Sequence, residues 1–387
     1  MYKSYFPAYR DIVYLDNAAT TMTPIDVVME NDYYLKFNAN IHRSPHELGQ
    51  RASNAYEEAR TVVAEFAGFN ANELIFTRNT TESINLLSNA LDLSTKDVVI
   101  VPWTEHHANL LPWRHAGCDI EYIDLSDEGE IDLVQLKRTL NRLKGRYHRT
   151  ILSFAHIGNI NGVIQPYKRI LTLTKAYGAL VHIDAAQSIS KFRYEHIDFV
   201  SFSGHKLYGP TGIGALCVRE KHFKQLKPYQ VGGGIITEVK KHTHSFIEGP
   251  AMFEAGTPNI AGAIQLQRAC EFLEEQGRKT LFEYETALTN KLKHAVLAGG
   301  GIPLTAKGAN IVTFDTEYHA GDVATLLGGK NIAVRGGMLC AEPYVSSINK
   351  NGLVRASVSF YNDESDIKIF EKGLIEVCQR LKKSKTK

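Results

Sequence analysis

Seven short apolar runs constrain the fold of this chain more than any other feature. Most are separated by segments long enough for a helix, and each is short enough to be a strand buried on both faces. Strands that alternate with helices are typical of a mostly parallel sheet covered by helices on both sides. The runs begin at Leu74, Val98, Ile120, Ile151, Leu180, Phe199 and Ala215.

The last two runs are an exception to this spacing. Too few residues separate the run at Phe199 from the run at Ala215 for a helical crossover, and a parallel return needs roughly a dozen residues or more. These two strands should therefore be antiparallel. The sequence predicts an α/β fold whose large domain holds a seven-stranded, mixed and mostly parallel sheet.

Helical periodicity appears between and after these runs. Leu133, Leu136, Leu140 and Leu143 recur at helical steps in the segment 132–143. Further helices are expected over 54–68, with Gly68 as its terminal glycine, over 258–297 with a break at Gly277, and over 363–381. Strands are expected at Ile311, Ile332 and Val354.

The length of 387 residues suggests two domains. We expect a large domain over 15–276 and a smaller C-terminal α+β domain over 277–387. Residues 1–14 should form an N-terminal segment that packs on the small domain.

Composition excludes several classes of function. The chain has 44 basic and 42 acidic residues, a net charge of +2 that gives no reason to expect nucleic acid or a membrane as the main partner. It has no run of roughly 20 apolar residues and no pattern of a signal peptide, so we expect a cytoplasmic protein.

The five cysteines are widely and irregularly spaced, which fits neither a disulfide framework nor a zinc site, and no metal is expected. Cys217, Cys270 and Cys378 lie in apolar strand or helix patterns and read as inert core thiols.

Lys206 is the first candidate for chemistry. It follows the apolar strand at Val200, stands between Ser203 and a turn rich in glycine, and has His205 beside it. Glycine-rich turns let the backbone approach a ligand, so this lysine can form a Schiff base with an aldehyde cofactor whose phosphate contacts Ser203 and His205. The alternative is a lysine at a strand end with glycines that only turn the chain.

Asp184 ends another apolar strand, 22 residues before Lys206. Pyridoxal 5'-phosphate (PLP) enzymes need an acid opposite the pyridine nitrogen, because the protonated ring is the electron sink. Asp184 meets this need, although an aspartate followed by Ala-Ala-Gln is also a reasonable helix N-cap.

Thr81 lies in Arg78-Asn-Thr-Thr-Glu-Ser, at a strand-to-helix junction. Backbone N–H groups and the helix dipole attract a phosphate at such a junction, and the threonine hydroxyl adds a donor. The alternative is ordinary N-capping.

These motifs, in this order, resemble the class V aminotransferase superfamily, and most closely its group II (Suf-type) cysteine desulfurases and selenocysteine lyases. The segments that carry the resemblance are 76–85, 105–113, 182–187, 203–214 and 253–259. The resemblance covers nearly the whole chain and implies the PLP-dependent transferase fold type I.

The resemblance also implies roles for individual residues. Lys206 is the lysine that binds PLP, and His106 stacks on the pyridine ring and moves protons. Thr257, in the turn 254–259, reaches the phosphate of the neighbouring subunit, which implies a homodimer, and His107 is more simply read as a wall residue. The remaining cofactor contacts are Thr80, Thr81, Asn159, Asp184, Gln187, Ser203 and His205.

Cys340 indicates which of the PLP-dependent reactions the chain would catalyse. It lies in a loop with two glycines and a proline, a setting that favours an accessible thiol. In the resembling family the cysteine of a similar loop takes sulfur from the substrate and becomes a persulfide. Arg355 matches the arginine that clamps the substrate carboxylate, with Arg335 and Asn159 as further substrate contacts. Met338 and Leu339, which precede Cys340, depart from the polar residues common in the family and would not help to deprotonate it.

The sequence therefore predicts a PLP-dependent cysteine desulfurase that converts L-cysteine to L-alanine and passes sulfur from Cys340 to an acceptor protein, as in iron–sulfur cluster assembly. A selenocysteine lyase shares the scaffold and needs no thiol nucleophile. Sulfinate elimination and epimerisation are other class V reactions. The alternative outside enzymes is a degenerate partner in a sulfur-transfer complex.

Overall fold

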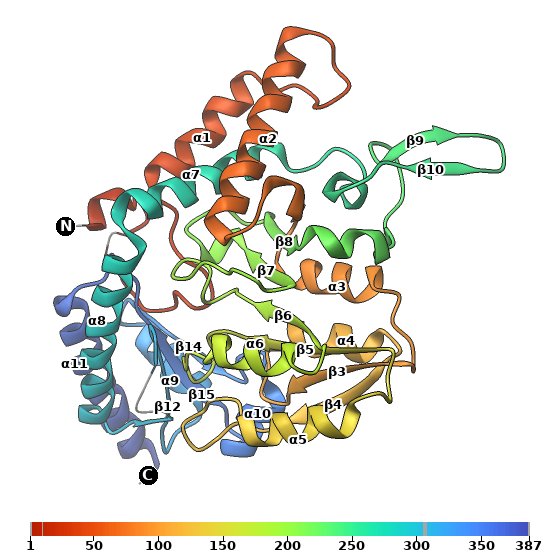
Figure 1. The fold of residues 1–387 in the computed structure, drawn as a ribbon. Coiled ribbons are helices and arrows are strands. Elements are labelled where there is room, and N and C mark those ends of the chain that lie inside the picture. The colour runs from red at the N-terminus through yellow and green to blue at the C-terminus, as the bar shows by residue number, and fades with distance from the viewer. Residues whose placement is uncertain (1, 10, 305–307, 386–387) are drawn as a thin grey trace.

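A seven-stranded sheet forms the centre of the computed structural model, which describes residues 2–9, 11–304 and 308–385 (Figure 1). Its strand order is β2-β8-β7-β6-β5-β3-β4. All seven predicted runs are strands of this sheet, which confirms the predicted fold class. The strands are β2 (Leu74–Thr77), β3 (Asp97–Pro102), β4 (Asp119–Ile123), β5 (Arg149–Ala155), β6 (Leu180–Asp184), β7 (Phe199–Ser203) and β8 (Gly214–Val218).

The strand directions agree with the expected mixed sheet. β4, β3, β5, β6 and β7 are parallel to their neighbours in this series. β8 is antiparallel to β7 on one side and to β2 on the other, as the short connection after β7 requires. That connection contains the short 3₁₀ helix η4 (Gly204–Lys206), so the strand reversal fixes where Lys206 lies.

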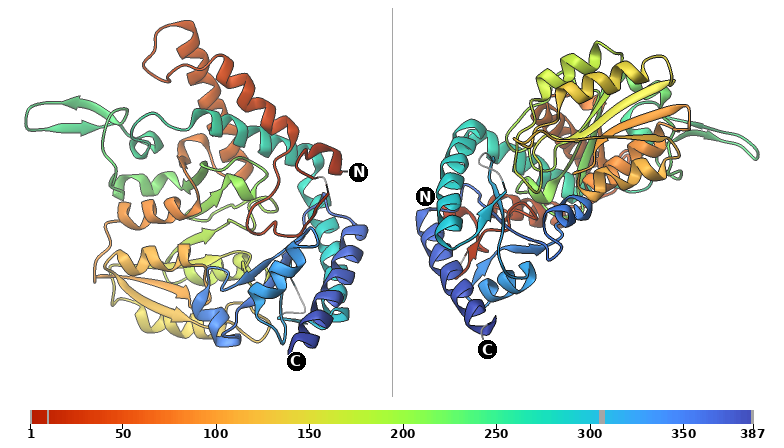
Figure 2. Two further views of the ribbon diagram at one scale, coloured as in Figure 1. Left: turned by 180° about the vertical axis from the view of Figure 1, so that it is seen from behind. Right: turned by 90° about the horizontal axis from the view of Figure 1, so that it is seen from below.

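Helices cover both faces of the sheet because the strands are apolar on both sides. On β3, Val98 and Ile100 pack into one core, while Val99 packs into another. α2, α5, α6 and α7 contribute to the first core, and α3 and α4 to the second (Figures 1 and 2). The helices are α1 (Ile25–Lys36), α2 (Glu47–Ala67), α3 (Thr80–Ala90), α4 (Leu111–His115), α5 (Leu133–Leu143), α6 (Tyr167–Lys175), α7 (Ile260–Gln276), α8 (Arg278–Ala298), α9 (Ala320–Gly328), α10 (Glu342–Ile348) and α11 (Glu364–Lys385).

The helix ends show which helix boundaries can be predicted from the local sequence. Asp132 caps α5 by accepting the N–H groups of Val134 and Gln135, and Gly277 separates α7 from α8 as predicted. α2 begins at Glu47, seven residues before the predicted Asn54. Its N-cap is His46, whose Nδ1 accepts the N–H of Gly49, a cap that sequence rules based on Ser, Thr, Asp and Asn do not detect.

A second, four-stranded sheet lies beside the first, in the C-terminal part of the chain (Figure 2). Its order is β11 (Ile302–Pro303), β12 (Ile311–Asp315), β15 (Leu353–Ser357), β14 (Arg335–Gly337), all antiparallel. α8 and α11 pack along its outer side (Figure 1).

The run predicted at Ile332 is divided between two sheets. β13 (Ile332–Ala333) pairs with β1 (Val13–Tyr14) of the N-terminal segment, and β14 joins the four-stranded sheet.

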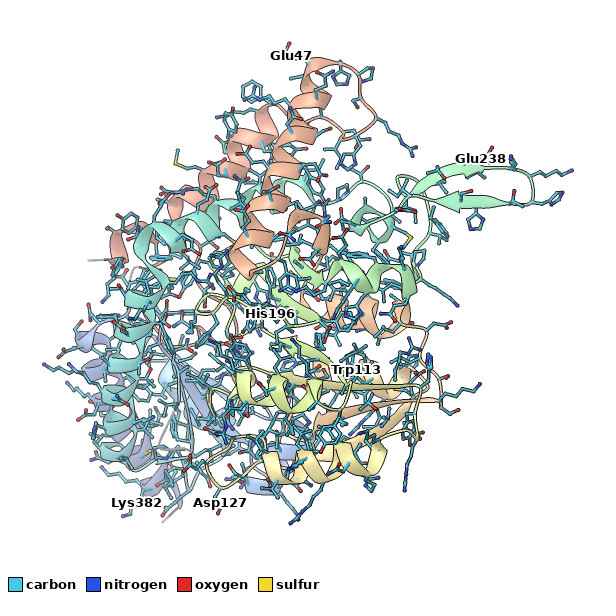
Figure 3. All side chains as sticks on the ribbon, in the orientation of Figure 1. Glu47, Trp113, Asp127, His196, Glu238 and Lys382 are labelled. Atoms are coloured by element: carbon cyan, nitrogen blue, oxygen red, sulfur yellow. The ribbon has the colours of Figure 1, made fainter. Side chains whose placement is uncertain are left out.

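A hairpin of β9 (Ile236–Val239) and β10 (His244–Phe246) extends away from the body, as the position of Glu238 shows in Figure 3. Its residues are mostly exposed. None of the helices in the described ranges is both apolar enough and long enough to span a membrane.

Candidate active site

A cavity of about 420 Å³ lies where the two sheets meet. The carboxyl ends of β5, β6 and β7 supply Ala155, Asp184 and Ser203 to its wall, and the four-stranded sheet supplies Arg335 and Arg355. Ligands in open α/β sheets bind at such strand ends. Every predicted site residue except Thr257 lines this cavity: Thr80, Thr81, His106, Asn159, Asp184, Gln187, Ser203, His205, Lys206, Arg335, Cys340 and Arg355.

Lys206 lies in the cavity wall at the end of η4. The pKa of its amine is lowered to about 8, chiefly by burial; the Asp184 carboxylate opposes this shift, while nearby Arg355 and Arg335 contribute to it. An amine with this pKa is partly unprotonated near neutral pH, which is the form that attacks an aldehyde or accepts a proton.

Asp184 ends β6 on the same side of the sheet. Its Oδ1 accepts the N–H of Ala186 at 2.8 Å, and burial raises its pKa. A cation bound opposite this carboxylate would stabilise its ionised form. Gln187, which follows, donates to the carbonyl oxygen of Ala18 at 2.7 Å and so joins the cavity to the N-terminal segment.

The start of α3 offers an anion site next to Lys206. The hydroxyls of Thr80 and Ser203 lie 2.7 Å apart, and the Thr80 N–H donates to the Ser203 hydroxyl. Asn79 caps the helix by accepting the N–H of Glu82. With these groups engaged within the protein, the hydroxyl and N–H of Thr81 are placed to bind a phosphate at the helix N-terminus.

His106 forms another part of the wall. Its Nδ1 accepts the N–H of Ala108 at 3.0 Å, and burial lowers its pKa to about 3, with Lys206 contributing in the same direction. The ring is therefore neutral at physiological pH. A flat, neutral imidazole can pack on a ligand ring, and because Nδ1 accepts the Ala108 N–H, the ring proton lies on Nε2, which can donate a hydrogen bond.

Glu105, which the sequence interpretation left without a role, anchors this segment from behind. It accepts the N–H of Ala155 at 2.9 Å and a side-chain N–H of Asn109 at 2.8 Å. Burial raises the pKa of its carboxyl to about 8. Because Ala155 ends β5, this bond ties the His106 turn to the central sheet.

The two arginines share an acidic partner that sequence reasoning also missed. Asp16 accepts a hydrogen bond from Arg335 Nη2 at 2.7 Å and lies 3.6 Å from Arg355 Nη2. Arg355 is 4 % exposed, its Nη1 donates to the Asn159 carbonyl at 3.1 Å, and its Nε has no partner among the described residues. One carboxylate thus faces two guanidinium groups, which leaves a positive charge available to a second carboxylate.

Cys340 is exposed and also lines the cavity, so it can meet both a bound molecule and one from solvent. The two glycines of its motif lie in β14 rather than in the loop, and Cys340 follows in a turn. Cys217 and Cys270 are fully buried, as expected, while Cys378 is only half-buried.

Thr257 lines a separate cavity of about 250 Å³ together with Asn40, His42 and Arg43. Its turn is anchored by Glu254, which accepts hydrogen bonds from Arg60 and from the N–H of Phe76. Within one chain, Thr257 therefore takes no part in the Lys206 cavity. No group of three or more metal-ligating side chains is found in the described part of the chain.

Comparison with known proteins agrees with this geometry. The family model of the class V aminotransferases matches residues 13–370. The chain is 36% identical over 395 residues to a probable cysteine desulfurase from Pyrococcus abyssi, covering 98% of this chain and 97% of the relative. It is also 36% identical to one from Halalkalibacterium halodurans, covering 94% and 92%.

Solved structures give the same result. The apo structure of a cysteine desulfurase from Thermococcus onnurineus NA1 superposes with a TM-score of 0.92 at 35% identity, covering 98% of this chain and 97% of that one. The cysteine desulfurase CsdA from Escherichia coli, in an S-sulfonic acid form, superposes with a TM-score of 0.88 at 31% identity, covering 98% of each chain.

Proposed function

Because the chain belongs to the class V aminotransferase family, we propose that it is a PLP-dependent cysteine desulfurase, which converts L-cysteine to L-alanine and leaves a persulfide on Cys340. The observation that carries the proposal is that Lys206, Arg355 and Cys340 line one cavity. An amine for the cofactor, a guanidinium for the substrate carboxylate and an exposed thiol for its sulfur are the groups this reaction needs.

The donor set fits PLP. Lys206 would hold the cofactor aldehyde, Asp184 its ring nitrogen and the start of α3 with Ser203 and His205 its phosphate, while His106 would pack on its ring. When bound, the cofactor supplies an electron sink for charge that develops on the substrate carbon. Asn159 and Gln187 present neutral amides to the same cavity, which adjust hydrogen bonding without competing with Asp184.

The protein side chains bind and orient the substrate and move its protons. Arg355 binds the α-carboxylate with its guanidinium group, which shares its partner Asp16 with Arg335, and Arg335 adds positive charge nearby. The Lys206 amine, with its pKa of about 8, accepts and returns the Cα proton. The neutral His106 ring, whose Nδ1 is engaged by the Ala108 N–H, presents its Nε2–H as a hydrogen-bond donor at the same cavity.

Cys340 takes the sulfur. Its thiolate attacks the substrate Sγ, and a new S–S bond forms while the substrate Cβ–Sγ bond breaks. The electron pair of the broken bond stays with the carbon skeleton, which takes up protons and leaves as L-alanine. The balance is L-cysteine plus one thiol giving L-alanine plus one persulfide, with no external oxidant or reductant.

The test is alanine production from L-cysteine by the purified holoenzyme and by a Cys340→Ser variant. The proposal predicts stoichiometric alanine and sulfur transfer in the parent and loss of cysteine desulfuration in the variant. Full desulfuration by Cys340→Ser would instead favour the selenocysteine lyase reading. Products other than alanine and sulfide would indicate sulfinate elimination or epimerisation, and a colourless protein unaffected by borohydride would indicate a non-catalytic partner.

We further propose a cytoplasmic homodimer in which Thr257 contributes to the neighbouring subunit's phosphate site. The exposed turn of Thr257 and its anchoring by Glu254 support this arrangement. A sulfur-acceptor protein, such as one in iron–sulfur cluster assembly, would then collect the persulfide from exposed Cys340. We place the large domain at 15–276 and the small domain at 277–387, with residues 1–14 packed on the small domain.

A further inference from the structure

The turn that carries Cys340 has an unfavourable backbone conformation. Leu339 and Cys340 both have left-handed φ angles, 53° and 55°, although neither is glycine. Such residues persist only where the surrounding contacts hold them, and they are common at functional sites. What holds this turn therefore decides where the thiol lies.

Two residues outside the turn hold it. The Asn159 side chain donates to the carbonyl oxygen of Leu339 at 3.0 Å. His107 makes two contacts: its backbone N–H donates to the carbonyl oxygen of Cys340 at 2.8 Å, and its Nε2 accepts the N–H of Glu342 at 3.1 Å. His107 thus holds the chain on both sides of Ala341, directly after the thiol.

The position of His107 in the chain adds to this observation. It begins the 3₁₀ helix η3 (His107–Asn109), and the residue before it is His106 of the cavity wall. Glu105 fixes the same segment to the end of β5. The Cys340 turn is therefore attached to the central sheet through the segment that also carries the ring-packing histidine.

The bond from Glu342 also defines the state of the imidazole. An Nε2 that accepts a backbone N–H carries no proton, so the proton of the neutral ring lies on Nδ1. A glutamine side chain can place its Oε1 near the position of Nε2 and accept the same N–H. An asparagine side chain reaches only as far as Nδ1 and cannot.

We propose that His107 is a positioning residue for the reaction: its imidazole clasps the Cys340 turn to the cavity and keeps the thiol aligned with the substrate sulfur. This inference rests on the proposed function, and it gives a role to a histidine that the sequence alone treats as a wall residue. His107 does not touch the reacting atoms. It acts through the backbone of residues 340–342.

The test compares His107→Leu, His107→Asn and His107→Gln holoenzymes with the parent and with His115→Leu, a control at an exposed histidine in α4. For L-cysteine, the Leu and Asn variants should lose about 10- to 100-fold in kcat, because a misplaced nucleophile slows the attack. KM should stay near that of the parent, since Arg355 and the cofactor contacts are intact. The Gln variant should keep most of its kcat.

A second measurement needs no turnover. Iodoacetamide labelling followed by peptide mapping should show Cys340 reacting several-fold faster in His107→Leu and His107→Asn, and at the parent rate in His107→Gln. Buried Cys217 and Cys270 in the same digests report unfolding, so they should stay unlabelled in every variant.

Two results would overturn the inference. One is unchanged Cys340 labelling in His107→Leu. The other is a His107→Gln variant with a kcat as low as that of His107→Leu, because the role of the imidazole would then not be to accept the N–H of Glu342. If the parent itself makes no alanine from L-cysteine, the proposed function fails. The labelling rates still show whether the His107 imidazole holds the Cys340 turn.

Discussion

Replacing Lys206 by methionine should make the cofactor-free protein more stable while it abolishes turnover. The reason is that the amine lies in the cavity wall, and its pKa is lowered to about 8, chiefly by burial. The Asp184 carboxylate offsets only part of this effect of burial. Folding therefore places a poorly compensated cation at this position, and methionine removes that cation with little change of volume.

The pKa sets the size of the effect. A decrease from 10.5 to about 8 corresponds to about 3 kcal/mol, at about 1.4 kcal/mol per pKa unit. Water in the cavity screens part of this, so we expect the variant to gain about 1–3 kcal/mol in free energy of unfolding at pH 7. Turnover should fall by several powers of ten, because both the covalent link and the general base are lost.

The stability gain of Lys206→Met over the parent depends on pH, and the pKa shift fixes the direction of that dependence. Below the folded-state pKa of about 8, lysine is charged in both the folded and the unfolded parent, and the full cost applies. Between about 8 and 10.5 the unfolded chain binds more protons, so the stability of the parent rises towards that of the variant. The gain should therefore shrink as pH increases through this range and vanish above it.

Lys191 provides the matched control. Its amine lies 3.2 Å from Glu285, and the two side chains are only 6% and 3% exposed. Lys191→Met breaks this buried pair and should destabilise the protein by about 3–5 kcal/mol. The assay is guanidinium unfolding of the cofactor-free proteins over a series of pH values. A Lys206→Met variant that is less stable than the parent at pH 7 would refute the reasoning.

Three further predictions concern the cofactor and substrate contacts. Arg355→Lys loses the paired N–H donors, so KM for L-cysteine should rise by about 10- to 100-fold with a smaller change in kcat, in steady-state alanine assays; an unchanged KM would exclude the clamp. Asp184→Asn should weaken PLP binding by about 10- to 100-fold in absorbance titrations, because a charge-assisted bond is lost, and equal affinity would contradict the assignment. Thr257→Ala should weaken the phosphate site of the neighbouring subunit. Mixed dimers of one Thr257→Ala chain and one Lys206→Ala chain should then regain about half of the parent activity, because one of their two sites is intact. No recovery of activity would place Thr257 in the site of its own chain.

The local signals in the sequence explain why so much of the fold was predictable. Each strand of the large sheet is a short run buried on both faces, and the short link between β7 and β8 dictates their antiparallel pairing. The end of α2 is equally local: Gly68 has a φ of 89°, and a Cβ there would lie 2.8 Å from the carbonyl oxygen of Tyr194.

The missed features depend on partners that are distant in the sequence. Asp16 meets Arg335 across 319 residues, and His107 meets Glu342 across 235. Neither Asp16 nor His107 lies in a sequence motif that predicts such a contact. The sequence predicts a start of α2 that is too late because the cap of this helix is an imidazole. It predicts one strand at Ile332 because only the fold brings β1 beside β13.

The most direct test of the account is the mass of the Cys340 peptide after a single turnover. Holoenzyme mixed with about one equivalent of L-cysteine, without a reductant or an acceptor, is alkylated, digested and analysed for alanine and for modified peptides. The proposed mechanism predicts one added sulfur atom on Cys340, in an amount equal to the alanine formed, and none on the other four cysteines. Alanine formed while the Cys340 peptide keeps its original mass, or sulfur carried by another cysteine, would contradict it.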